Sequence, residues 1–393
     1  MNFRFLRALS CLAVIGLSIS AYGQDSTRFT FGGSVDTYFH SSFGLRNGYP
    51  SDGDGGYNGS VAPNTSFADG KGFSIGMVNL IASYAGEKVG FTADVVFGPR
   101  GKAAVFGTAS GQAIINQAFV YYKLGKAVTL NLGQFNTFLG YEVISPAVNF
   151  HYSTSYLFSW GPFNHTGLRA DFDLGNGFVG KLAIMNPTDI VEFNPVNTYT
   201  AGLQLGKTTD AGGIWFNFLY GDQDGTLDAD IDGDGATSRG NLFQADITTG
   251  WNLTDAFYLG VNASYQMIGD GEVVNGTSVN KATNTSSSFA GIAVYPKVTL
   301  SENFALGLRA EYFSIKDSHL NIIALDDGDT GDGSVMEFTL SGNYKVGGLT
   351  FIPEIRIDKT SENTFYKKDD VGTITAPDKT LFPTLNLAAV YKF

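Results

Sequence analysis

The residues that could do chemistry are few and lie far apart along the chain. Asp230, Asp232 and Asp234 take positions one, three and five of a run that resembles the opening of a calcium-binding loop, with Gly235 at position six. Position twelve is Asn241, where such a loop needs a glutamate that binds through both of its oxygens. The pattern is therefore partial. It predicts a calcium site in an outer loop, and the alternative is an acidic loop that simply lies in water.

A hydrolytic site would need a histidine beside a nucleophile. His151 is followed by Ser153 and Ser155, and this is the most enzyme-like arrangement in the chain. The sequence contains no His-Glu-x-x-His or P-loop motif. Cys11, the only cysteine, lies within an apolar run at the start of the chain. We therefore interpret His151 as a hydrogen-bonded loop residue and predict that the protein is not an enzyme and has no cofactor other than calcium.

Charged residues recur at every second position in several segments. Arg169 and Asp171 alternate with Leu168, Ala170 and Phe172, so the charges fall on one face of a strand and the apolar side chains on the other. Asp173 and Asp358 also lie on such polar faces, and the further charges that we expect to line the pore are Lys181, Arg309, Glu311, Glu354 and Arg356. Rows of opposite charge along a channel could screen solutes by their electric field. The alternative is that these charges pair only to satisfy one another.

The same alternation extends over the whole chain from Phe29 onward. Phe257, Leu259 and Val261, for example, share one face of a segment whose other face is more polar. Composition agrees, because 50 Gly, 32 Phe and 19 Tyr accompany only 16% charged residues, and aromatic residues favour strands. The segments run for about ten to thirteen residues, the length that crosses a bilayer when a strand is tilted. Strands of soluble proteins average about five or six residues.

The connections between these segments alternate between short and long, as they do in outer-membrane barrels. The long ones cover roughly 43–72, 99–111, 137–164, 187–197, 222–240, 269–286, 316–333 and 359–379. Eight long and seven short connections predict about 16 strands, with both termini on the periplasmic side. The predicted fold is thus an all-β, transmembrane, antiparallel barrel whose apolar face meets lipid and whose polar face lines water.

The two ends of the chain fit an exported barrel. Residues 1–23 combine basic residues, a short apolar run and small residues before Gln24, which is typical of a cleaved signal peptide. Residues 24–393 then form a single barrel domain. Phe393 ends a final alternating strand, a pattern resembling the signal read by the machinery that inserts barrels. We therefore predict the outer membrane of a Gram-negative bacterium.

The loop at 137–164 differs from the others because it is rich in aromatic residues. These are Phe138, Tyr141, Phe150, Tyr152, Tyr156, Phe158, Trp160 and Phe163. A loop in water seldom carries so many, so we predict that it folds into the lumen and narrows the pore, with Glu142 and His151 near the constriction. The alternatives are that it caps the barrel mouth or contacts a neighbouring subunit.

The segments Leu132–Ile144, Tyr152–Phe158 and Gly161–Gly167 resemble the central block of the OmpL-like β-barrel porin family of Gram-negative bacteria. That block is a strand, an inserted loop and a strand that opens with a His-Thr-Gly step, here His165-Thr166-Gly167. The leader, the glycine-rich strands and Phe393 fit the family over the full chain. The resemblance implies a porin-like barrel and diffusion of small solutes, and it names no substrate.

The predicted function is therefore passive diffusion of small hydrophilic solutes through an outer-membrane porin. The alternative is a non-conducting structural or adhesive barrel that acts through calcium-binding outer loops. The expected partners are outer-membrane lipid, lipopolysaccharide, the insertion machinery and the solutes, and a homotrimer is common for barrels of this size. The net charge of −12 argues against nucleic acid. The acidic outer loops lead us to expect cations or neutral solutes in preference to phosphates.

Overall fold

The structure is a computed structural model. It describes residues 28–47, 62–105, 114–223, 225, 241–269, 273–274, 277–278, 286–322, 331–367 and 377–393. The predicted signal peptide, residues 1–23, and the three aspartates of the predicted calcium site, Asp230, Asp232 and Asp234, lie outside these residues.

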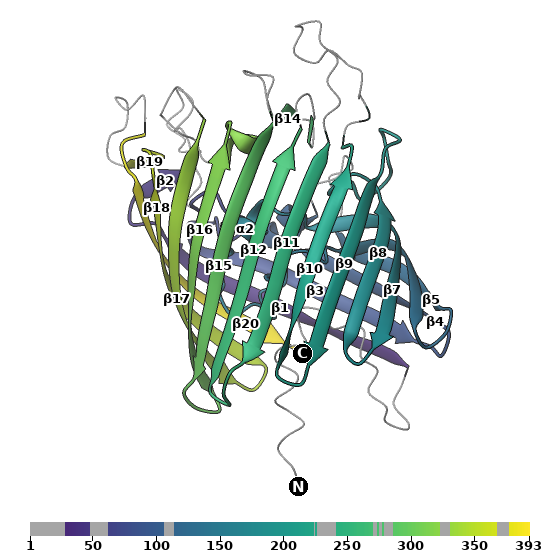
Figure 1. Cartoon of the computed structure of the whole chain (residues 1–393). Helices are drawn as coiled ribbons and strands as arrows, with labels where there is room; N and C mark the ends of the chain where they lie inside the picture. The colour runs from purple at the N-terminus through teal and green to yellow at the C-terminus, as the bar shows by residue number, and fades with distance from the viewer. Residues whose placement is uncertain are drawn as a thin grey trace, which may run out of the picture.

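The described chain forms a closed barrel of 16 antiparallel strands (Figure 1). Its strands are β1 (Phe29–Ser41), β3 (Gly72–Ala85), β4 (Val89–Phe97), β5 (Ile115–Lys123), β6 (Val128–Asn136), β7 (Asn164–Gly175), β8 (Phe178–Met185), β9 (Thr200–Thr209), β10 (Gly212–Gly221), β11 (Leu242–Asn252), β12 (Phe257–Ile268), β15 (Ser287–Thr299), β16 (Phe304–Lys316), β17 (Gly333–Val346), β18 (Leu349–Thr360) and β20 (Leu381–Lys392). Each strand pairs with its neighbours along the chain, and β1 closes the ring by pairing with β20. The predicted fold class and the predicted strand number are confirmed.

Small elements lie among the connections. They are β2 (Leu45–Asn47) paired with β19 (Phe365–Lys367), β13 (Val273–Val274) paired with β14 (Thr277–Ser278), α1 (Pro99–Ala104), α2 (Tyr156–Ser159) and η2 (His319–Asn321). Within the described residues, no helix has the length and apolar character needed to span a membrane. In Figure 1 the short turns lie at the bottom of the barrel, where the C-terminus also lies.

The two faces of the wall differ as the alternation predicts. Outward side chains are apolar and exposed, and Phe73 is 91% exposed. Inward positions of the same strands hold polar groups such as Asp36, Asn79 and Asn262, all of which are buried. A barrel in water would gain nothing from so many exposed apolar rings, whereas lipid tails solvate them well.

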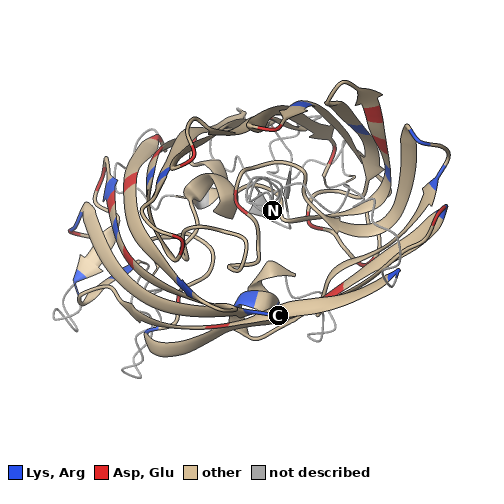
Figure 2. Cartoon of the chain, turned by 90° about the horizontal axis from the view of Figure 1, so that it is seen from below, with Lys and Arg blue, Asp and Glu red and all other residues tan. Residues whose placement is uncertain are grey.

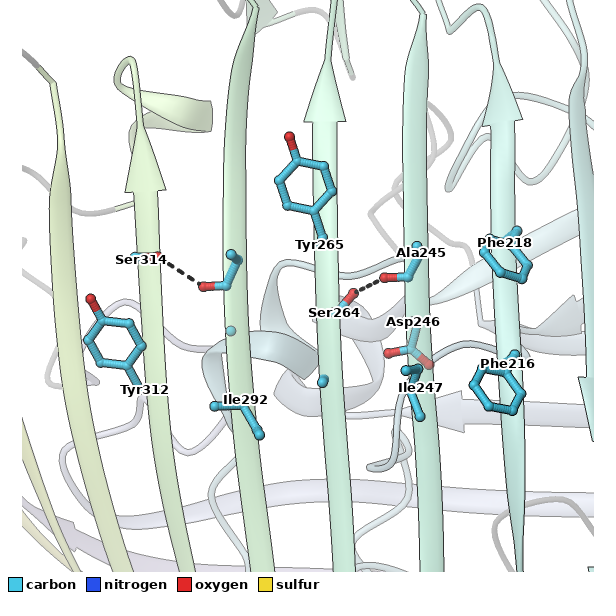
Figure 3. Close-up of a pocket in the computed structure, with 13 residues that line it drawn as sticks. Phe216, Phe218, Ala245, Asp246, Ile247, Ser264, Tyr265, Ile292, Tyr312 and Ser314 are labelled. Atoms are coloured by element: carbon cyan, nitrogen blue, oxygen red, sulfur yellow. Dashed lines mark hydrogen bonds between the residues drawn. The ribbon is translucent and has the colours of Figure 1, made fainter.

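A shallow groove of about 460 Å³ marks the outer wall between β10 and β16 (Figure 3). It lies where Ala245, Ala263 and Ala290 are flanked by larger side chains such as Phe218 and Tyr265. The groove follows from the mixture of small and large apolar residues on the lipid side. It is therefore a surface feature of the outer face and not a passage through the barrel.

The packed core of the molecule lies inside the barrel, between the wall and the loop that joins β6 to β7. One cluster packs Tyr156 and Leu157 of this loop against Phe289 of β15 and Phe313 of β16. A second cluster packs Phe158 and other loop residues against β3 and β4. The aromatic residues of the loop therefore pack against side chains of the wall.

Candidate functional site

The candidate site is the segment between β6 and β7, residues 137–163, together with the wall that surrounds it. Figure 2 looks into the barrel from the end with the short turns and shows chain and a short helix inside the ring of strands. Thr137 and Phe163 close the base of this segment with a backbone hydrogen bond of 2.9 Å. We call residues 137–163 the inner loop.

Two glutamates of the wall hold the backbone of the inner loop. The Glu354 carboxylate on β18 accepts hydrogen bonds from the backbone N–H groups of Tyr152, at 2.8 Å, and Ser153, at 3.1 Å. The Glu311 carboxylate on β16 accepts from the backbone N–H groups of Tyr156 and Leu157, both at 2.8 Å. Each carboxylate uses both oxygens in this way. Such charge-assisted bonds are stronger than bonds between neutral groups.

Two arginines bind the carbonyl groups of the same stretch. Arg309 on β16 donates to the Ser153 carbonyl at 2.7 Å, and Arg356 on β18 donates to the Thr154 carbonyl at 2.6 Å. Glu142, within the inner loop, accepts from the Ser155 N–H at 2.7 Å and from Arg309 at 2.7 Å. Between residues 152 and 157, charged side chains therefore replace the hydrogen bonds that water would make to the free backbone.

Other parts of the wall hold the inner loop at further points. The Tyr152 hydroxyl donates to Asp36 on β1 at 2.6 Å. The Gly140 N–H donates to Asp246 on β11 at 3.0 Å. The Tyr141 hydroxyl donates to the Tyr258 hydroxyl on β12 at 2.9 Å, above Gly260, where any side chain would collide with the Tyr141 ring. The inner loop is therefore tied to strands on several sides of the barrel.

Two more acids complete the charged cluster behind the inner loop. Glu337 on β17 binds Arg309 through both carboxylate oxygens, at 3.0 and 3.2 Å. Asp358 on β18 binds Arg356 in the same way, at 2.8 and 2.7 Å. Glu337 was not singled out in the sequence, although Glu337, Thr339 and Ser341 alternate with apolar residues as the other polar faces do. Asp358 shares a polar face with Glu354 and Arg356 in the sequence but was not predicted to line the pore.

The structure brings together five of the predicted pore-lining residues. Glu142, Arg309, Glu311, Glu354 and Arg356 all contact the inner loop or one another, as described above, and none of them is more than 5% exposed. This differs from a wall of charges open to water. The reason is that their side chains are fully used by backbone groups and by one another, which is the pairing alternative raised from the sequence.

The other three predicted wall charges form a separate group on β7 and β8. Arg169 binds the Asp171 carboxylate through two nitrogens, at 2.8 and 3.0 Å, and Lys181 lies 3.8 Å from the same carboxylate. Their side chains keep between 12% and 18% of their surface exposed. None of the hydrogen bonds from these three residues reaches the inner loop. They are thus the predicted wall charges that stay in contact with water.

His151 lies in the inner loop and is 3% exposed. Its Nδ1 atom is 2.8 Å from the Ser341 hydroxyl on β17, and that hydroxyl donates to Glu354 at 2.8 Å. Ser153 and Ser155 instead hydrogen-bond to Arg309 and to the Phe158 N–H. The imagined pairing of His151 with Ser153 or Ser155 is therefore not the arrangement present.

Acid should weaken the docking of the inner loop through His151. Burial, with a smaller contribution from Arg309, lowers the pKa of His151 to about 4, against the opposing effect of Glu354, Glu142 and Glu337. A free loop would hold His151 at its ordinary pKa of about 6.5. The undocked state therefore binds the proton more readily. The contribution of His151 to the free energy of docking is fully present above about pH 6.5. It falls by up to about 3 kcal/mol as the pH is lowered to about 4, and it does not change further below that pH.

Hydrogen exchange of the inner-loop amides at pH 7 and pH 4.5 measures this effect. The control is His151→Gln, which keeps a neutral hydrogen-bonding side chain beside Ser341 but does not titrate. The pH dependence should be steeper in the unmodified protein than in the variant. Equal slopes would show that His151 does not link the loop to pH.

The predicted calcium residues Asp230, Asp232 and Asp234 lie outside the described residues. Among the described residues, no group of three or more His, Cys, Asp and Glu side chains has a geometry that could hold a metal ion. The calcium site accordingly stays a prediction from the sequence.

Comparison with solved structures finds barrels of the same fold at low sequence identity. DcaP, an outer membrane channel of Acinetobacter baumannii, has a TM-score of 0.59 at 14% identity, covering 93% of this chain and 97% of that chain. OmpF of Salmonella typhi, in complex with daunomycin, has a TM-score of 0.56 at 11% identity, covering 93% and 97%. OmpT of Vibrio cholerae in a trimer form has a TM-score of 0.56 at 12% identity, covering 94% and 100%.

A search of curated protein sequences finds no match. The family model described as "Putative beta-barrel porin-2, OmpL-like" matches residues 28–393, which include every strand of the barrel and the whole inner loop. The chain therefore belongs to the OmpL-like family of β-barrel porins of the Gram-negative outer membrane.

Proposed function

We propose that this porin is a passive diffusion pore whose cross-section is set by the inner loop, and that it catalyses no reaction. The observation that carries the proposal is the asymmetry of the interior. The inner loop is bound through charged side chains to β16 and β18, whereas Arg169, Asp171 and Lys181 on β7 and β8 keep contact with water. A solute path beside the loop, along the wall from β5 to β8, fits this arrangement.

Single-channel conductance in a planar bilayer tests the proposal. Purified, folded protein should give stepwise openings whose current rises linearly with voltage, because a fixed water-filled path obeys Ohm's law. The control is the same preparation after heat unfolding, which should be silent. Silence from a barrel that is shown to be folded would contradict the proposal and favour the non-conducting alternative.

The proposed partners follow from the two faces of the wall and from the chain end. Outer-membrane lipid and lipopolysaccharide would cover the exposed apolar rings. Phe393, which hydrogen-bonds to Gly33 of β1 in both directions at 3.1 Å, would present the final strand to the insertion machinery before the barrel closes. A homotrimer is supported by the trimer form of the similar OmpT, and size-exclusion chromatography with light scattering would test it.

Two predictions concern residues outside the described part of the chain. We propose that residues 1–23 are removed on export, which the N-terminal sequence of the protein from membranes would test. We also propose a weak calcium site at Asp230, Asp232 and Asp234. Calorimetric titration with Ca²⁺ tests it, and an unchanged signal in Asp232→Asn would contradict it.

A further inference from the structure

The charges that face the lumen divide into two sets by their exposure. The buried set contains seven acids and two bases within the described strands: Asp36, Asp94, Asp246, Glu311, Glu337, Glu354, Asp358, Arg309 and Arg356. Most of these acids are committed to the inner loop or to the two arginines, as described above. Arg309 and Arg356 balance part of the charge of these acids, and each of the seven acidic side chains is at most 3% exposed and so has little direct contact with the water path.

The set that remains half-buried or exposed is mostly basic. In the described strands it contains six bases and two acids: Lys123, Arg169, Lys181, Lys297, Lys345, Lys392, Asp171 and Asp173. Each lies on the inward face of its strand, because each pairs across the ladder with another inward residue, as Lys123 does with Thr129. Arg169 lies midway along β7, and the others lie in the half of the barrel that carries the short turns.

Three of these bases, Lys123, Arg169 and Lys181, lie on neighbouring strands with both of the acids, Asp171 and Asp173. The four successive strands from β5 to β8 carry, at positions paired across the ladder, Lys123, Thr129, Asp171 and Lys181. Arg169 binds the Asp171 carboxylate through two bonds, and Lys181 stays at 3.8 Å from it, while the Lys123 ammonium donates to the Gly86 carbonyl at 3.4 Å. Three bases against two acids leave this part of the wall with a small excess of positive charge. On another arc of the wall, the Lys297 ammonium lies 4.6 Å from the centre of the Tyr258 ring and adds to the same sign.

From this distribution we propose that the lumen selects small anions, such as carboxylates and phosphate, over cations, with Lys123, Arg169 and Lys181 as the residues that set the preference. The inference rests on the proposed function of a diffusion pore. It opposes the cation preference that the acidic outer loops suggested. Charges on the narrow wall lie closer to a passing ion than charges at the mouth, and screening in salt limits the reach of the latter to about 8–10 Å.

The reversal potential across a bilayer with a KCl gradient measures the preference directly. The unmodified protein should favour chloride over potassium. A unit charge about 8 Å from an ion in water changes the local ion concentration about twofold. Because the charge raises chloride and lowers potassium by that factor, Lys123→Gln and Lys181→Gln should each lower the chloride-to-potassium permeability ratio about fourfold, and the double variant by about the product of the two effects. Asp171→Asn should raise the ratio, because it removes the negative charge that balances Arg169.

The matched control is Lys207→Gln. Lys207 lies on β9 close to β8, but on the outward face, with its ammonium 4.1 Å from the centre of the Phe178 ring. It should leave the ratio unchanged. A potassium preference in the unmodified protein, or equal ratios for Lys181→Gln and Lys207→Gln, would overturn the inference while leaving the pore intact. A folded barrel without any current would overturn the pore and the inference together.

Discussion

Replacing residues 141–160 with a short Gly/Ser linker should raise the single-channel conductance severalfold. This stretch contains the aromatic side chains that fill the interior and the backbone groups that Glu311 and Glu354 bind. The wall itself does not depend on it for strand pairing, because β6 and β7 are hydrogen-bonded to each other along their whole shared length. The barrel should therefore close without the inner loop and leave a wider water path.

A smaller change tests the same point without a deletion. Glu311→Gln combined with Glu354→Gln keeps the inner loop but replaces one acceptor oxygen in each carboxylate with a donor. Openings should become larger and noisier, because the loop would leave the wall part of the time. Glu302→Gln, in the exposed turn between β15 and β16, is the control for the same type of substitution and should conduct like the unmodified protein. Unchanged conductance in the linker variant would show that the inner loop does not set the cross-section.

The barrel itself could be predicted because its rule is local. Alternation assigns each residue to a face from its immediate neighbours, and the short and long connections fix how many strands there are. The same rule correctly placed Arg309, Glu311, Glu354 and Arg356 on inward faces. The rule could not predict how deeply an inward side chain is buried. Alternation shows that a side chain points inward, but not whether it contacts water or another part of the chain.

The burial of an inward side chain depends on contacts between residues that are far apart in sequence. Glu142 meets Arg309 across 167 positions, and Tyr152 meets Asp36 across 116. No local pattern encodes those pairs. The aromatic content of the inner loop suggested that it packs, but not which strands would receive it. For that reason Asp36, Asp246, Glu337 and Asp358 were not recognised as part of the site.

Arg309→Met should be the most destabilising single substitution in the charged cluster, at about 3–5 kcal/mol of unfolding free energy. The guanidinium is fully buried and uses all of its nitrogens, on Glu142, Glu337, Ser153 and Thr339. Methionine fills a similar volume but leaves the carboxylates of Glu142 and Glu337 buried without this partner. The cost comes mainly from those stranded charges and not from the lost bonds.

That reasoning predicts a rescue. The triple variant Arg309→Met, Glu142→Gln and Glu337→Gln removes both stranded charges and should recover most of the lost stability, because replacing a buried charge together with its direct partners is often nearly neutral. Urea unfolding, followed by the heat-modifiable shift on gels, measures both variants. Arg28→Met provides a control in an exposed ion pair with Glu87 and should change little. A triple variant less stable than Arg309→Met would mean that attraction within the cluster stabilises the barrel. A small loss of stability in Arg309→Met would mean that water reaches the cluster.

Since the cluster also holds the inner loop, the rescued barrel should conduct more than the unmodified protein even though it is nearly as stable. This result would separate the role of these charges in setting the width of the path from their role in folding.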